Sequence, residues 1–124
     1  MKTSDDLIQV FSRGTEVVVR FSSDHLNRFD TARRISMDVG ELIENGICRA
    51  HPIDRVNVDF SGIDRISSAG LNGLIQMNSK GRCHGVQLVL MDVPKAVREV
   101  FAMTRLERMF EFKTSEIAVA GAAG

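Results

Sequence analysis

The strongest constraint on the fold is the segment 56–80, in which a strand leads into a helix through a short polar connection. Val56–Phe60 is rich in β-branched and aromatic residues, as strands are, and a Ser-Gly pair directly after it supplies a tight turn. Over residues 68–80 apolar side chains recur at helical spacing. A strand followed directly by a helix is the building unit of α/β folds, so the chain is expected to belong to that class.

Two adjacent serines, Ser67 and Ser68, stand where this helix begins. The first backbone amides of a helix lack intrahelical partners and carry partial positive charge. One interpretation is that a serine hydroxyl caps the helix, which is worth about 0.5–2 kcal/mol. The other is that a hydroxyl accepts a phosphate, because the same amides favour a negative group. The residues alone leave both interpretations open.

The rest of the chain repeats the same two kinds of element. Further strands are expected over Ile8–Ser12, Glu16–Phe21, Val86–Met91 and near Met109–Phe112, and further helices over Thr31–Asn45, after Pro94 and from about Ser115. Arg13-Gly14-Thr15 should turn the first hairpin, the stretch 22–30 has no clear periodicity, and Asp30 is the expected N-cap of the helix that follows it. Alternation of strand and helix implies right-handed crossovers and a largely parallel sheet.

The sheet is expected to carry its helices on one face. A sheet covered on both faces has strands that are apolar at nearly every position. Here Asn57 and Asp59 alternate with apolar residues, and Gln87 lies between two of them. The predicted fold is therefore α/β, with a mixed, mostly parallel sheet of four to five strands, an N-terminal β-hairpin and about four helices largely on one face.

Length and composition place this fold in a single domain, expected over residues 1–117, with a frayed tail over 118–124. The chain has 124 residues, with 16 lysines and arginines against 16 aspartates and glutamates, a balance that argues against nucleic-acid binding. No apolar run approaches the roughly 20 residues of a membrane span, and the polar N-terminus lacks the core of a signal peptide. Cys48 and Cys83 do not make a disulfide framework, so a cytoplasmic protein is expected.

The order of elements and the strand-to-helix connection resemble the STAS domain, and within it the bacterial anti-sigma-factor antagonists. The likeness is strongest over Val58–Leu74, where an acidic residue ends the strand and two serines precede an Ala-Gly-Leu triplet. Pro94–Leu106 is similar to the third helix of the family and the threonine-containing turn after it. Ser67 stands where many members carry aspartate, and segment 22–30 lacks the Gly-Glu-Leu/Ile-Asp turn that helps members dock their kinase.

The resemblance implies a protein–protein switch and not an enzyme. In the family, the serine two residues before the glycine is phosphorylated by a partner that is both anti-sigma factor and serine kinase, and that position is Ser68 here. The unphosphorylated antagonist binds the kinase and frees sigma, the phosphorylated form lets go, and a phosphatase resets it. No cofactor is expected. The partner-binding residues expected from this likeness are Asp24, Asp30, Asp64, Ser67, Ala69, Asn72 and Gln76.

Other functions compete with this hypothesis. The alternative within the family is a non-switching accessory subunit of a lipid-transport or sensory complex, in which Ser68 is never modified. A hydrolase would need a base beside Ser68, and of the three histidines only His25 falls near enough in the expected topology. The nucleophile-elbow spacing is absent as well.

A metal site and a self-association surface are the remaining candidates. Cysteines and histidines occur in two short segments, Cys48 with His51 and Cys83 with His84, but their spacing matches no common structural zinc pattern, so no metal site is expected. Four apolar residues near the end could pack in the core or support a weak homodimer; they are Met103, Leu106, Met109 and Phe110.

Overall fold

Five strands form one mixed sheet in the order β1-β2-β3-β4-β5 in the computed structural model, which describes residues 7–46 and 52–115. The strands are β1 (Gln9–Arg13), β2 (Glu16–Arg20), β3 (Arg55–Asp59), β4 (Gln87–Met91) and β5 (Glu111–Lys113). β1 and β2 form an antiparallel hairpin, and the other neighbouring strands are parallel. The predicted N-terminal hairpin and mostly parallel sheet are therefore confirmed.

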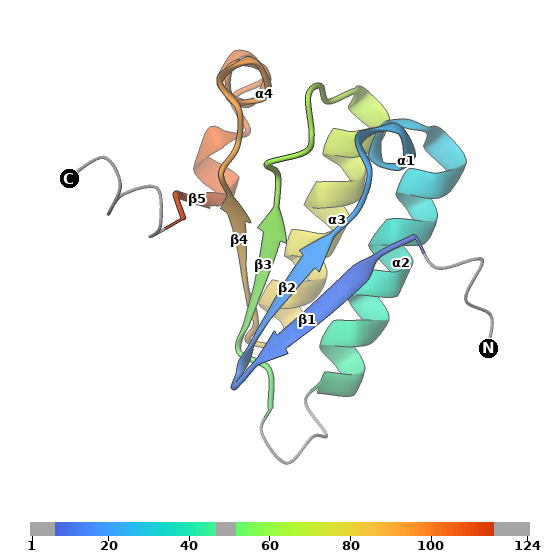
Figure 1. Cartoon of the computed structure of the whole chain (residues 1–124), viewed down its shortest axis with the longest axis vertical. Helices are drawn as coiled ribbons and strands as arrows, with labels where there is room; N and C mark the ends of the chain where they lie inside the picture. Colours follow the sequence, from blue (N-terminus) through green and yellow to red (C-terminus); the bar gives the residue numbers. More distant parts are fainter. Residues whose placement is uncertain (1–6, 47–51, 116–124) are drawn as a thin grey trace.

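Two long helices, α2 and α3, run side by side behind this sheet in the view of Figure 1, and α1 and α4 lie near the top of the view. The helices are α1 (Ser23–Asn27), α2 (Phe29–Gly46), α3 (Ser68–Cys83) and α4 (Lys95–Met103), followed by the 3-10 helix η2 (Glu107–Met109). In the described part of the chain, none of these helices combines the length and the apolar character that crossing a membrane requires.

Side-chain alternation along the strands explains why the helices gather on one face. Val17 of β2 is paired in register with Val56 of β3, which is paired with Leu88 of β4, and all three are buried. The same face continues into β5, where Phe112 is paired with Leu90. Onto this surface pack the buried stripes of α2 and α3, which include Ile35, Val39, Ile43, Leu71 and Leu74.

The opposite face of the sheet carries a polar network. Arg55 donates from Nε to Oε1 of Gln87 at 3.1 Å, and Asn57 donates from Nδ2 to Oε1 of Glu16 at 3.0 Å. Gln87 also donates to the carboxylate of Glu111, so the network crosses from β2 to β5. These polar residues alternate along the strands with the apolar residues of the core, which confirms the prediction of helices largely on one face.

The polar stretch 22–30 is more regular than its sequence suggested. The Ser22 hydroxyl accepts a hydrogen bond from the His25 amide at 3.1 Å and thereby caps α1. This helix contributes a single buried side chain, that of Leu26. One apolar residue cannot create a periodic pattern, which is why the sequence did not reveal the helix.

The start of α2 corrects a second expectation. A helix over 31–45 with Asp30 as N-cap was predicted, but α2 begins at Phe29. Asp30 therefore lies inside the first turn, where its carboxylate accepts from the amide of Thr31 at 3.0 Å. An acidic side chain in this turn still interacts favourably with the helix dipole.

The second half of the chain follows the predicted order closely. α4 begins directly after Pro94, and β5 covers Glu111–Lys113, with Met109 in the preceding turn of η2. The predicted terminal helix from Ser115 and the tail 118–124 extend outside the described residues, as do Cys48 and His51.

The apolar residues near the end divide between core and surface. Phe110 is buried and Leu106 packs against the core, as the core interpretation expects. Met103 is 82% exposed and Met109 is 39% exposed. A weak homodimer through these methionines stays a prediction.

Phe101 holds α4 against the sheet and provides a test of the core. Its buried ring meets Phe110 and Phe112 edge to face, with centroids 5.4 and 5.3 Å away. Phe101→Ala should lower the free energy of unfolding by about 3–5 kcal/mol, because it leaves a cavity between α4 and β5. Met103→Ala, on the exposed side of the same helix, should change it by less than about 0.5 kcal/mol. Urea unfolding followed by circular dichroism measures both, and equal losses would contradict this packing.

Candidate functional site

The connection from β3 to α3 is held by hydrogen bonds at its first turn. The carboxylate of Asp59, the last residue of β3, accepts from the Ser61 amide at 2.9 Å and forms an ion pair with Arg20 at 2.9 Å. Burial alone would raise the pKa of Asp59, but the hydrogen bonds from Ser61 and the charge of Arg20 outweigh it and lower the pKa. Ile63 is buried in the core, so the chain is anchored again before it reaches α3.

Ser67 is the N-cap of α3. Its hydroxyl oxygen accepts from the Gly70 amide at 3.2 Å and donates to the backbone carbonyl of Asn27 at 3.2 Å. Its own amide donates to Oδ1 of Asn27 at 2.6 Å. The partly buried Ser67 side chain is therefore used in structure, and the capping interpretation applies to this serine.

Ser68 is the first residue of α3, and its side chain is exposed. Within residues 7–46 and 52–115, no hydrogen bond engages its hydroxyl. The amides of the first turn around it have no intrahelical partners, and this turn contains no acidic residue. The free hydroxyl thus lies in a region of positive backbone potential.

Asn27, the last residue of α1, ties this corner together. Its Nδ2 donates to the carbonyl of Ser23 at 2.9 Å and to the carbonyl of Arg65 at 2.8 Å. Its Oδ1 and carbonyl receive the two bonds from Ser67. Sequence reasoning missed this residue, because its partners lie about 40 positions away and nothing local marks the contact.

Two of the predicted acidic residues meet beside this corner. Arg65 donates to Asp24 at 2.8 Å and to Asp64 at 3.3 Å, and Ser23 donates to Asp64 at 2.8 Å. The Ser23 hydrogen bond, supported by Arg65, lowers the pKa of Asp64. The carboxylate of Asp30 is bonded to the amide of Thr31 instead and takes no part in this cluster.

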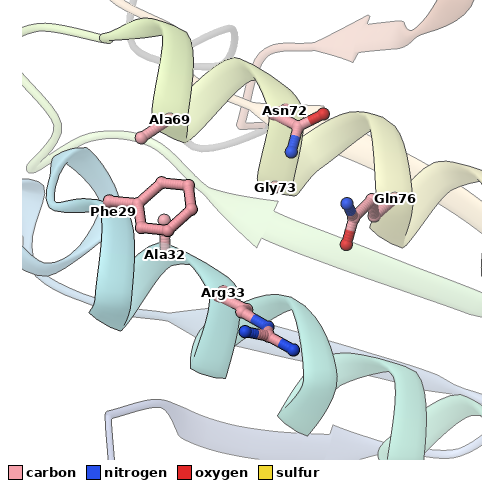
Figure 2. A pocket seen from close by; sticks show the side chains of 7 residues that line it. All are labelled: Phe29, Ala32, Arg33, Ala69, Asn72, Gly73 and Gln76. Carbon is pink, nitrogen blue, oxygen red and sulfur yellow. The ribbon is translucent and has the colours of Figure 1, made fainter.

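The predicted residues on α3 line a hollow between α2 and α3. Ala69, Asn72 and Gln76 border a cavity of about 210 Å³, which Figure 2 shows with the side chains around it. Ala69 points from α3 toward the ring of Phe29 on α2. The side chain of Phe29 is 76% exposed, which is unusual for a large apolar ring. The remaining lining residues are Ala32, Arg33 and Gly73.

Sequence reasoning did not single out Phe29 or Arg33. Both lie on the first turns of α2, and the distance between α2 and α3 decides whether they border a cavity. That distance is short because Gly73 lies against the backbone of Ala32, where an added Cβ would be 3.4 Å from the carbonyl oxygen. In the sequence, Phe29 lies in the aperiodic stretch 22–30, where no pattern marks it as part of a helix or of a cavity.

The geometry does not indicate nucleophilic or metal chemistry in the described part of the chain. No imidazole or carboxylate is hydrogen-bonded to Ser68 there, so the hydroxyl lacks the general base that an activated nucleophile requires. Among residues 7–46 and 52–115, no three metal-ligating side chains come together. The Ser68 hydroxyl is instead placed where a second protein could reach it.

Comparison with sequence families gives a match that spans most of the chain. The sequence model of the STAS domain family matches residues 8–118. No curated protein matches the chain significantly.

Solved structures show the same fold at low sequence identity. An anti-sigma-factor antagonist (STAS) domain protein from Planctomyces limnophilus is 16% identical with a TM-score of 0.70, over 94% of this chain and 98% of that one. The anti-sigma factor antagonist SpoIIAA in its unphosphorylated form is 16% identical with a TM-score of 0.67, over 94% and 96%. The Bacillus cell fate determinant SpoIIAA in its phosphorylated form is 16% identical with a TM-score of 0.62, over 93% and 98%.

The two adjacent serines should differ in their effect on stability. Ser67→Ala removes the cap of α3 and should lower the free energy of unfolding by about 1–2 kcal/mol. Ser68→Ala removes an exposed hydroxyl without partners and should change it by less than about 0.5 kcal/mol. Urea unfolding of both variants measures the difference. A larger loss of stability in Ser68→Ala than in Ser67→Ala would show that Ser68, and not Ser67, caps α3.

Proposed function

Because the chain belongs to the STAS domain family, we propose that it is an anti-sigma-factor antagonist controlled by phosphorylation of Ser68. The unphosphorylated domain binds an anti-sigma factor that is also a serine kinase, and the phosphorylated domain releases it. A phosphatase restores the binding form. The domain is thus a substrate and a competitor in the cytoplasm and does not act as an enzyme.

One observation carries the proposal: of two neighbouring hydroxyls, the capping one is hydrogen-bonded, whereas that of Ser68 is exposed and has no partner among the described residues. A kinase must reach the acceptor oxygen, and Ser68 meets this condition without any rearrangement of α3. The likeness to SpoIIAA supports the idea, since that protein has been solved in unphosphorylated and phosphorylated forms. Both forms share the fold of this chain.

The physical effect of a phosphate differs between the free domain and a complex. A phosphoserine adds about −1.5 to −2 charges and three acceptor oxygens. At the start of α3, amides without intrahelical partners and the lack of an acidic residue in the first turn let the free domain tolerate this charge. In a desolvated interface the same charge is unfavourable by several kcal/mol, which weakens binding by orders of magnitude.

The partner surface proposed here surrounds Ser68. It comprises the cavity between α2 and α3 with Ala69, Asn72 and Gln76, and the Asp24–Arg65–Asp64 cluster, in which Asp64 and Arg65 belong to the connection that leads to Ser68. The exposed ring of Phe29 is its largest apolar side chain. Aromatic residues beside a hollow are frequent binding hot spots, so Phe29 is the expected anchor.

Phosphorylation of Ser68 tests the function directly. The chain is incubated with serine kinases of the anti-sigma-factor class and ATP, and the phosphate is located by mass spectrometry. Modification at Ser68 is expected, with complete loss in Ser68→Ala and retention in Ser67→Ala. Ser68→Asp should weaken kinase binding by at least about a hundredfold through repulsion and desolvation while the melting temperature stays nearly constant.

Two outcomes would contradict the switch. If no kinase of this class modifies the chain, the non-switching accessory role becomes the better interpretation. If Ser68→Asp lowers melting temperature and binding together, the serine has a structural role.

Substitution of Phe29 tests the partner surface. Phe29→Ala should weaken binding to the kinase by at least about tenfold, because it removes the anchor from the cavity. Its stability should hardly change, since the ring is 76% exposed. Met37→Ala is the matched control, because Met37 is also exposed, at 56%, and lies two turns further along α2. Isothermal titration calorimetry measures both, and equal affinities would exclude Phe29 as the anchor.

A further inference from the structure

The two serines at the start of α3 are chemically identical, yet their surroundings differ. Ser67 uses its hydroxyl proton for the carbonyl of Asn27 and accepts the amide of Gly70 on the hydroxyl oxygen. Before Ser67 could attack a phosphorus atom, its hydroxyl would have to leave both partners. Ser68 has neither constraint. The contacts that hold the Ser67 hydroxyl in place therefore favour Ser68 over Ser67 as the phosphoacceptor.

Asn27 accepts the hydroxyl proton of Ser67 on its main-chain carbonyl, and its side chain holds the Ser67 backbone in the position that this bond requires. The Asn27 amide group is held from two sides, by the carbonyl of Ser23 in α1 and by the carbonyl of Arg65 in the connection before α3. In this orientation its Oδ1 receives the Ser67 amide at 2.6 Å, the shorter of the two bonds between these residues. Ser67 is thus held through its backbone and its side chain by the same asparagine.

Gly70 leaves room for this arrangement. A Cβ at this position would lie 3.0 Å from Oδ1 of Asn27 and 3.2 Å from Cγ of Leu26. The contact between α1 and the first turn of α3 is therefore close, and a methyl group would push the asparagine side chain away from Ser67. The absence of a side chain at Gly70 therefore allows the hydrogen bond between Asn27 and Ser67 to form.

We propose that Asn27 selects Ser68 over Ser67 as the phosphoacceptor, an inference that rests on the proposed function. Asn27 acts through Ser67 and does not touch the transferred group, so it is a positioning residue. In the transfer, the bond from the hydroxyl oxygen of Ser68 to the γ-phosphorus of a nucleoside triphosphate forms. The bond from that phosphorus to the β–γ bridging oxygen breaks, the nucleoside diphosphate leaves, and a base of the kinase takes the hydroxyl proton.

The test compares the distribution of phosphate between the two serines. Wild type, Asn27→Ala and the matched control Asn45→Ala, an exposed asparagine at the other end of α2, are each treated with ATP and anti-sigma-factor-type serine kinases. Peptide mass spectrometry then gives the ratio of phospho-Ser68 to phospho-Ser67. This ratio should fall about tenfold or more in Asn27→Ala, because the side chain that holds the Ser67 backbone against α1 is lost and the contact of the Ser67 hydroxyl with the main-chain carbonyl of residue 27 loosens with it. It should stay at the wild-type value in the control.

A second measurement and a second variant guard against a general loss of structure. Amide hydrogen exchange by NMR should show the Ser67 amide exchanging about tenfold faster in Asn27→Ala, while amides in β3 keep their protection. Gly70→Ala retains both serines and the asparagine but displaces Oδ1, and it should shift phosphate toward Ser67 in the same direction.

The outcomes separate this inference from the proposed function. Phosphate on Ser68 alone in wild type, Asn27→Ala and Gly70→Ala would overturn the role of Asn27 and leave the phosphoswitch intact. Absence of phosphate from both serines in wild type would overturn the switch and the selection together. A shift in the asparagine and glycine variants, but not in Asn45→Ala, supports the selection.

Discussion

The hydroxyl of Ser67 connects α1, the end of the β3–α3 connection and the first turn of α3, and the geometry of the candidate site depends on it. It receives the Gly70 amide, and it is directed toward the carbonyl of Asn27. Because Ser67 is the N-cap, Ser68 becomes the first residue of α3, where its side chain is exposed to solvent. One hydrogen-bonded residue therefore sets the exposure of its neighbour.

The buried side of α3 stabilises the domain, and the exposed side of the same helix forms part of the candidate site. Leu71 and Leu74 anchor α3 on the covered face of the sheet, whereas Asn72 and Gln76 point to the other side of the helix. Charge added at the exposed side need not disturb the buried side. Such a division lets a surface change its partner without a change of fold.

Most of the fold could be predicted from the sequence, because burial on one face leaves a regular pattern. The strand at 56–60 and the helix from 68 follow from that pattern, as does the hairpin before them. The helix α1 did not, since it buries only Leu26. Asn27 was missed for a different reason: its hydrogen bond to Ser67 joins residues distant in the sequence, and no local rule describes such a contact.

The roles of the two serines were also beyond local rules. Ser67 and Ser68 both satisfy the preference for a hydroxyl at a helix start. Only the path of the chain from β3, together with the packing of α1, decides which one becomes the cap. The same holds for the cavity beside Phe29, since its presence depends on how closely α2 approaches α3 at Gly73.

The short helix α1, found where an irregular stretch was expected, has a consequence for recognition. Arg28 alone separates α1 from α2, and hydrogen bonds of Asn27 hold the connection 60–67, which leads to the exposed serine, against α1 (Figure 1). A surface of this kind is preorganised, and a partner that docks on it loses little conformational entropy in ordering it. Binding should then approach rigid-body docking, in which the exposed side chains of the free domain determine selectivity.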